Sequence, residues 1–146
     1  MIITPITTQH LNNISGLYVN VFKAPPWNEN WEQQWALERL TNIFHCPNFK
    51  GFIIEQDSVI IGSIMGRGTT FQGKKEFEIC ELFIVPTKQG LGFGSALYDH
   101  LLAELNIQGY KIITLLTSRK VPALDFYTNK SFKKSDDIVF MFKQVG

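Results

Sequence analysis

Apolar and polar residues follow two rhythms along this chain, and these rhythms predict its helices and strands. Apolar residues recur every three or four positions across 11–22, which predicts a first amphipathic helix that Pro25 ends. The same spacing across 31–44 predicts a second helix. Its start is expected at Asn28 or Asn30, because short polar side chains of this kind cap helix N-termini.

Runs of β-branched and other apolar residues predict the strands. These runs cover 2–6, 52–54, 59–65, 77–85, 110–117 and 138–142. The polar stretch Gln56-Asp57-Ser58 joins the second run to the third and predicts a hairpin. Residues 66–75, which contain two glycines, are expected to form a loop before the fourth strand.

A glycine-rich turn and a helix follow the fourth predicted strand. Leu97, Leu101 and Leu105 fall on one face of that helix. Because another strand comes next, this strand–helix–strand unit predicts a crossover between parallel strands. A short helix is expected after Pro122, since proline suits the first turn of a helix.

Composition is that of an ordinary globular protein. The chain has 146 residues, enough for one domain, with 45% hydrophobic and 18% charged residues. No apolar run approaches the ~20 residues needed to span a bilayer. The first ten residues lack a basic segment followed by an apolar one, so we expect a cytoplasmic protein without membrane contact. Cys46 and Cys80 are too few for a disulfide framework, and we expect reduced, buried thiols.

Charge is unevenly distributed, although the net charge is only +1, which argues against nucleic acid as the main partner. Residues 111–146 carry seven Lys and Arg against three Asp, a balance of +4. The first 110 residues carry seven basic and ten acidic groups, a balance of −3. The C-terminal part therefore suits a phosphorylated ligand and the N-terminal part a cation. The three histidines are scattered, and no metal-ligand spacing occurs.

The stretch Gln89-Gly90-Leu91-Gly92-Phe93-Gly94 lies between a predicted strand and a predicted helix. Its three glycines leave backbone N–H groups uncovered. The helix adds unpaired first-turn N–H groups and the positive end of its dipole, which together predict a cradle for phosphate or pyrophosphate. The spacing fits neither the Walker pattern, since Ser95-Ala96 follows the last glycine, nor the dinucleotide pattern G-x-G-x-x-G.

The spacing Q/R-x-x-G-x-G/A, formed by Gln89, Gly92 and Gly94, resembles motif A of the GNAT superfamily of N-acetyltransferases. In that family the loop holds the pyrophosphate of acetyl-CoA. The order of the predicted elements resembles the GNAT order over nearly the whole chain.

A second stretch resembles the GNAT motif N-x-x-A-x-x-x-Y-x-x-x-G-F. Ala123, Tyr127 and Phe132 keep its spacing, while Lys120 stands in place of the Asn and Ser131 in place of the Gly. These two departures put in doubt the ligand contacts of that Asn and a turn with positive φ before the last strands.

The resemblance implies an α/β (α+β) fold in a single domain, 1–146. We expect a mixed, mostly antiparallel sheet of six to seven strands flanked by about four helices. It also implies acetyl-CoA (coenzyme A) as cofactor and direct acetyl transfer, in a ternary complex, to a primary amine of a small molecule or peptide. The implied cofactor-binding residues are Leu82, Phe83, Ile84, Gln89, Gly90, Leu91, Gly92, Phe93, Gly94, Ser95, Ala123, Phe126, Tyr127 and Lys130.

Family members are often dimers, so a homodimer is an open alternative to a monomer. An alternative function is a non-catalytic acyl-CoA-binding module on the same scaffold, which the departures at Lys120 and Ser131 would favour.

Three residues are candidates for proton transfer. Tyr127 resembles the general acid of the family, and a phenol is protonated at pH 7 and able to donate. Glu78 and Glu81 are candidates for the general base, because a carboxylate within so apolar a strand is costly unless it faces a wet cleft. Strand alternation would place the two on opposite faces, and we favour Glu81. A water relay is an alternative for either.

The acceptor site is expected between the first two helices. Trp27, Asn28, Glu29 and Trp31 cluster there and suggest an aromatic, partly acidic pocket for a small cationic amine. Residues 66–75 are expected to form another wall of that pocket.

Overall fold

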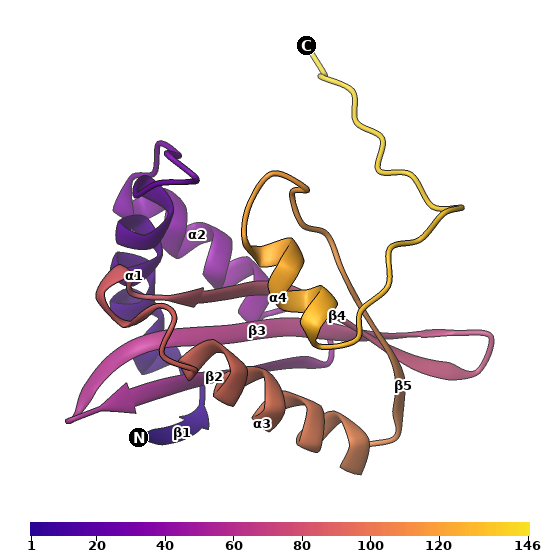
Figure 1. The fold of residues 1–146 in the computed structure, drawn as a ribbon, viewed down its shortest axis with the longest axis horizontal. Coiled ribbons are helices and arrows are strands. Elements are labelled where there is room, and N and C mark those ends of the chain that lie inside the picture. The colour runs from indigo at the N-terminus through magenta and orange to yellow at the C-terminus, as the bar shows by residue number, and fades with distance from the viewer. The chain divides into compact units, whose positions relative to one another are not determined.

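A five-stranded sheet is the centre of residues Met1–Leu116 in the computed structural model of this protein, which describes all 146 residues. Its strands are β1 (Ile2–Pro5), β2 (Phe49–Gln56), β3 (Val59–Phe71), β4 (Lys74–Ile84) and β5 (Tyr110–Leu115). They lie side by side in chain order (Figure 1). All neighbours are antiparallel except β4 and β5, which are parallel, as the strand–helix–strand pattern predicts.

Three helices cover this sheet. They are α1 (Leu11–Lys23), α2 (Gln33–Phe44) and α3 (Phe93–Ile107), and the single-turn 3-10 helices are η1 (Thr8–His10) and η2 (Pro86–Lys88). Figure 1 shows α1 and α2 on one face of the sheet and α3 across the other. On the first face Ile14 and Leu40 are fully buried in one core with Met65 of β3. On the second, Leu97 and Leu101 of α3 are fully buried.

The second helix begins later than its sequence pattern predicts. Its first residue is Gln33, and Glu32 occupies the N-cap position in an extended conformation, so neither Asn28 nor Asn30 caps it. Asn28 instead adopts a positive φ of 50° in the connecting turn. Trp31 therefore precedes the helix and packs from a connecting segment.

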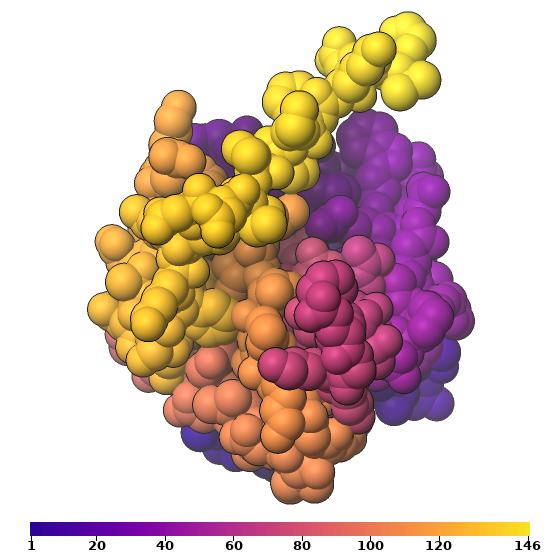
Figure 2. Space-filling view, turned by 90° about the vertical axis from the view of Figure 1, so that its right-hand side faces the viewer, coloured from indigo at the N-terminus to yellow at the C-terminus, as the bar shows by residue number.

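Both hairpins turn on two residues with positive φ. Asp57 and Ser58, at φ 53° and 64°, join β2 to β3 where the sequence predicts a hairpin. Gln72 and Gly73, at φ 51° and 78°, join β3 to β4. The expected loop 66–75 is therefore wrong: most of it pairs as strand, because two residues suffice to reverse the chain. In Figure 2 this β3–β4 hairpin, in crimson, lies beside β5, in orange.

One extra residue in β4 controls which way its side chains point. Met65 of β3 pairs with Glu81 and Gly66 pairs with Ile79, so Cys80 has no partner on β3 and forms a β-bulge. Gly66 is required there, since a Cβ on it would collide with the carbonyl oxygen of Glu78. The regular alternation of β4 is thus broken between Ile79 and Glu81.

Residues Thr117–Gly146 form a second unit, described by itself. Its helix, α4 (Ala123–Asn129), starts after Pro122 as predicted. Residues 132–146 contain no helix or strand, so the expected strand 138–142 is wrong and the sheet has five strands rather than six or seven. Strand periodicity shows only that a segment could pair, whereas a strand also needs a neighbour to hydrogen-bond. Ser131 adopts φ 71°, the left-handed turn that the family motif's glycine would make.

Two glycine substitutions should change stability in opposite directions. Gly66→Ala should lower the free energy of unfolding by about 1–3 kcal/mol, because its Cβ forces β3 and β4 apart at the bulge. Gly16→Ala, within α1, should raise it by about 0.5–1 kcal/mol, since alanine favours the helix and its Cβ meets only Gln33 Oε1 at 3.4 Å. Urea titration of both variants checks this, and equal effects would contradict the strand contact at Gly66.

Candidate active site

The second half of β4 has a free edge. β5 pairs with β4 only from Lys75 to Ile79, so the strand beyond Cys80 lacks a partner on that side. The N–H of Val85 donates to Ile61 O on β3 at 2.8 Å. In an antiparallel ladder, residues whose N–H and C=O groups bond the neighbouring strand alternate with residues whose groups point away from it. Because Val85 bonds β3, Ile84 and Leu82 direct their N–H and C=O groups away from β3. At the open edge Leu82 presents its N–H and C=O groups, and Ile84 presents its N–H group, because the Ile84 carbonyl already accepts from the Gln89 side chain.

Phe83 behaves differently from its two neighbours. It pairs with Ser63 at a position where its N–H and C=O groups point toward β3. Its side chain is buried against Tyr18, with 5.4 Å between ring centroids. Of the three strand residues expected to hold the cofactor, Leu82 and Ile84 therefore offer backbone groups, whereas Phe83 packs in the core.

The predicted anion cradle follows directly after this edge. The Gln89 side chain turns back and donates from Nε2 to Ile84 O at 2.9 Å, which fixes the start of the loop to the end of β4. Gly90 and Gly92 adopt φ 74° and 89°, which favours glycine strongly. A Cβ on either would meet no atom within 4 Å, so the space beside this backbone is open. The Leu91 side chain between them is exposed.

The first turn of α3 completes the cradle. Its first intrahelical bond runs from Ala96 N–H to Gly92 O at 3.0 Å, and no side chain caps the helix. The N–H groups of Phe93, Gly94 and Ser95 precede that bond and have no partner in the helix. Together with the helix dipole they form an environment that favours an anion.

Glu81 directly precedes Leu82 on β4, and it is buried, with 8% of its surface exposed. Its Oε1 accepts hydrogen bonds from Arg39 Nε on α2 at 2.6 Å and from Tyr18 Oη on α1 at 3.1 Å. Burial raises the pKa of Glu81 above its ordinary value, while Arg39 and Tyr18 oppose that rise and the Glu29 carboxylate adds to it. A carboxylate with a raised pKa accepts protons more readily than an exposed one.

The second carboxylate oxygen of Glu81, Oε2, is the one available to accept a proton. Both of its hydrogen bonds end on Oε1. No buried side-chain oxygen in the protein lacks a hydrogen-bond partner, so Oε2, which has none, must be reached by solvent. Solvent access at Oε2 is what a proton acceptor needs.

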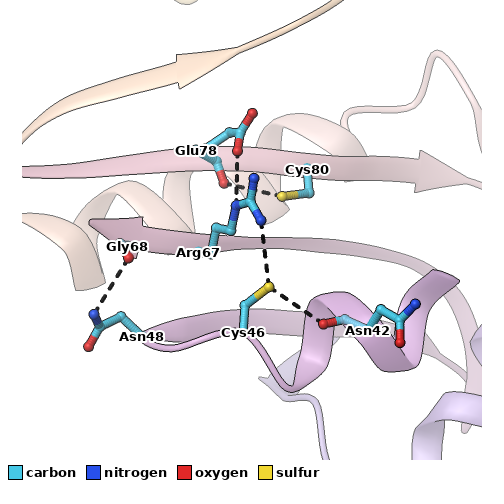
Figure 3. Close-up of polar contacts among 7 residues, drawn as sticks. All are labelled: Asn42, Cys46, Asn48, Arg67, Gly68, Glu78 and Cys80. Atoms are coloured by element: carbon cyan, nitrogen blue, oxygen red, sulfur yellow. Dashed lines mark hydrogen bonds and ion pairs between the residues drawn. The ribbon is translucent and has the colours of Figure 1, made fainter. Parts of the chain in front are cut away.

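Glu78 is held in a more exposed ion pair. Arg67 Nε donates to its Oε1 at 3.1 Å, and Arg67 Nη1 donates to Cys46 Sγ at 3.7 Å (Figure 3). Arg67 and Met65, which face Glu78 and Glu81, are two residues apart on β3 and so share one face. The expectation that the two glutamates lie on opposite faces is therefore wrong, because the bulge at Cys80 inserts an extra residue between them.

Both cysteines are free, but they are half-buried rather than buried as the sequence predicts. Burial raises the pKa of the Cys80 thiol to about 11, with the Glu78 carboxylate adding to the shift. Cys80 is therefore a neutral thiol at pH 7 rather than a nucleophile.

Aromatic rings surround the Tyr18 side of Glu81. Tyr18 contacts Phe22 at 4.5 Å, Trp31 at 4.9 Å and Phe83 at 5.4 Å between ring centroids. Trp27 contacts Phe22 at 5.3 Å. Both tryptophans are half-buried, so the structure brings these two sequence candidates to one aromatic cluster beside the buried carboxylate.

Glu29 is attached to this cluster. Trp31 Nε1 donates to Glu29 Oε1 at 2.8 Å, and the Glu29 N–H donates to Phe22 O at 2.8 Å. Asn28 donates only a long bond, 3.5 Å, to Pro26 O. Glu29 is exposed and influences the titration of both Glu81 and Tyr18, so it lies within electrostatic reach of the site. Residues 66–75 form the end of the β3–β4 hairpin rather than a loop, and their place in a wall of the acceptor pocket stays a prediction.

The C-terminal candidates lie on α4 and at its C-terminal end. Tyr127 is buried, and its ring contacts Phe126 at 5.2 Å and Phe132 at 5.4 Å between centroids. Lys130 follows the last helical residue, and its N–H donates to Tyr127 O at 3.0 Å. Ala123 is the first residue of the helix.

A sequence model described as "Acetyltransferase (GNAT) family" matches residues 18–132, well over half of the chain. The chain belongs to this family. No curated protein sequence matches it.

Solved structures share the GNAT fold at low identity. A possible acetyltransferase from Clostridium difficile 630 has a TM-score of 0.84 at 10% identity, covering 99% of this chain and 98% of that one. An aminoglycoside acetyltransferase from an uncultured soil metagenomic sample, in complex with sisomicin, has a TM-score of 0.76 at 17% identity, covering 99% and 96%. Ribosomal-protein-alanine N-acetyltransferase from Brucella melitensis biovar Abortus 2308 has a TM-score of 0.77 at 11% identity, covering 99% and 100%.

GNAT acetyltransferases generally use acetyl-CoA, and the residues of this chain fit such a group. The fit rests on the open space beside Gly90 and Gly92, the unpaired amides at the start of α3, and the free edge at Leu82 and Ile84. No cluster of three metal-ligating side chains occurs. None of the helices of this GNAT protein has the length and apolar character to cross a bilayer.

Sequence reasoning missed Tyr18 and Arg39. Tyr18 lies in the apolar stripe of the first helix, which by itself indicates a core residue, and the sequence pattern assigns no role to Arg39. The shared polar partner of both residues is the buried Glu81 on β4, which is 63 positions from Tyr18 and 42 positions from Arg39 along the chain.

Proposed function

We propose that this GNAT protein transfers an acetyl group from acetyl-CoA to a primary amine, directly and within a ternary complex. The observation that carries the proposal is the open edge of β4 at Leu82 and Ile84, placed between the glycine loop and the buried Glu81. An anion cradle, backbone donors and a proton acceptor thus follow one another along one strand and its turn.

Acetyl-CoA would supply an activated acyl thioester. The amides of residues 90–95 would bind its pyrophosphate, because those of Phe93, Gly94 and Ser95 have no partner within the helix and lie at its N-terminus. The Ile84 and Leu82 backbones would hydrogen-bond the extended part of the molecule along the free edge. An N–H group there would also stabilise the negative charge that develops on the thioester oxygen.

The acceptor amine must lose a proton. An alkyl amine with a pKa near ~10.4 is only roughly 0.04% neutral at pH 7, a penalty of about 4.6 kcal/mol. Glu81 Oε2 is solvent-accessible within an otherwise buried carboxylate, and it would take that proton from the bound ammonium, which frees the nitrogen lone pair that then forms the C–N bond.

The departing sulfur must gain a proton as the C–S bond breaks. Tyr127 would donate it, since a phenol is protonated at neutral pH and the Ala123–Tyr127–Phe132 spacing resembles the family motif. Ser131 takes the positive φ of the motif's glycine, so this departure leaves the turn after the helix intact.

The acceptor is proposed to be a small cationic amine. Glu29 and Glu81 supply negative charge, and Trp27, Trp31 and Phe22 supply aromatic faces that attract cations. The names of two structural neighbours, an aminoglycoside acetyltransferase and a ribosomal-protein-alanine N-acetyltransferase, are consistent with amine acceptors of either size.

Acetyl transfer is tested by thiol release from acetyl-CoA with a panel of polyamines, aminoglycosides, amino acids and peptides. Wild type should turn over at least one amine, and Tyr127→Phe should lower kcat roughly 10²- to 10⁴-fold because the leaving thiolate loses its proton donor. The affinity for acetyl-CoA, measured by calorimetry, should change little.

Binding of acetyl-CoA without turnover of any amine would instead favour a non-catalytic acyl-CoA-binding module. In that case Tyr127→Phe should leave every measured property unchanged.

The base is tested by comparing Glu81→Gln with Glu78→Gln. Glu81→Gln should lower kcat/KM roughly 10²- to 10⁴-fold, whereas the exposed pair at Glu78 should matter little. Because burial raises the pKa of Glu81, wild-type kcat/KM should fall on acidification at a pH above the ordinary glutamate value, since the base must be deprotonated to act. A larger loss in Glu78→Gln would reverse the assignment.

The cation preference is tested with 1,4-diaminobutane and n-butylamine. Glu29→Gln should raise KM for the diamine roughly two- to fivefold, because an exposed carboxylate attracts the second ammonium only modestly. KM for n-butylamine should change less, and 0.5 M salt should remove the difference. An equal rise for both amines would show that Glu29 does not bind a second charge.

A further inference from the structure

Three elements meet at one carboxylate oxygen. Arg39 Nε on α2 and Tyr18 Oη on α1 both donate to Glu81 Oε1 on β4. A carboxylate with both donors on the same oxygen cannot rotate without breaking one of these bonds. The pair therefore determines which oxygen remains outside the core.

Tyr18 is a rigid donor. Its side chain is 3% exposed, and its ring is enclosed by Phe22, Trp31 and Phe83. Burial and the Glu81 carboxylate raise the pKa of Tyr18, so its hydroxyl stays protonated and donates. Because the ring cannot move, the hydroxyl fixes the position of Oε1.

Arg39 supplies the charge. Its side chain is 47% exposed, yet its Nε lies 2.6 Å from Oε1. A guanidinium that remains hydrated at one end can hold a buried carboxylate at the other, which reduces the cost of desolvating both groups. Glu29 is the second charged group that acts on Glu81, and its effect on the Glu81 pKa opposes that of Arg39.

We propose that Arg39 and Tyr18 are positioning residues for Glu81, holding Oε1 so that Oε2 is the atom that takes the proton of the amine. Neither residue touches the reacting atoms in this scheme. The inference rests on the proposed function, because it gives Oε2 a role only if Glu81 is the base. It predicts that loss of Arg39 affects the proton-transfer step and leaves acetyl-CoA binding intact.

Four variants test the proposal, each first checked for wild-type thermal unfolding. Arg39→Met removes charge and donor, Arg39→Lys keeps the charge, and Tyr18→Phe removes only the hydroxyl. Arg67→Met is the matched control, because it breaks the Arg67–Glu78 pair on the same face of the sheet. The pH dependence of kcat/KM is measured for each, together with the carboxyl ¹³C titration of Glu81, assigned with Glu81→Gln.

Arg39→Met should lower kcat roughly 10- to 100-fold through misplacement of the base, with KM for acetyl-CoA unchanged. The acid limb of its kcat/KM profile and the titration of its Glu81 carboxyl should both move to higher pH, because the guanidinium lowers the pKa of Glu81. Tyr18→Phe should shift both in the same direction. Arg39→Lys should restore the acid limb but not all of kcat, since an ammonium lacks the planar geometry of arginine.

Unchanged kcat and an unchanged acid limb in Arg39→Met would overturn the proposal, as would an acid limb that moves in Arg67→Met instead. If no amine is acetylated by wild type, the proposed function fails and the carboxyl titration alone decides. A higher pKa of Glu81 in Arg39→Met would then still support the hold of Arg39 and Tyr18 on Oε1. An unchanged titration of Glu81 would overturn it.

Discussion

The arrangement of this site depends on one extra residue in β4. Without the bulge at Cys80, regular alternation would place Glu81 on the same face as Phe77 and Ile79, under α3. With it, Glu81 faces α1 and α2, where Arg39 and Tyr18 can reach it. The bulge is in turn possible because Gly66 leaves room for the carbonyl of Glu78.

A buried carboxylate is expensive, and the surrounding structure offsets that cost in a specific way. Arg39 and Tyr18 satisfy Oε1, while Oε2 keeps contact with water. The carboxylate is therefore fixed in position while one of its oxygens stays accessible to solvent. Glu78, only three residues away, pairs with Arg67 at a more exposed position, so two glutamates on one strand have different environments.

The same strand contributes a second feature, its unpaired far edge. β5 leaves β4 at Ile79, so Leu82 and Ile84 carry backbone groups without strand partners. Gln89 then ties the glycine loop to Ile84 and aligns the start of α3 with that edge. Membership of the GNAT family gives this arrangement a chemical meaning, whereas neighbours at 10–17% identity establish only the fold.

Features of this protein that depend on local physics can be predicted from its residue pattern alone. Apolar spacing located the helices, Asp57-Ser58 located a hairpin turn, and the glycines of residues 90–94 located the turn that leads into α3. The sequence pattern wrongly assigned residues 66–75 to a loop, where β3 and β4 continue to a two-residue turn. It also wrongly predicted a strand at 138–142, because a strand needs a pairing partner that periodicity does not reveal. Which glutamate is buried, and that Arg39 and Tyr18 hold it, depends on how distant segments pack together. A one-residue bulge reverses a side chain's direction without leaving a signature in the sequence pattern, and the residues that meet there are far apart along the chain.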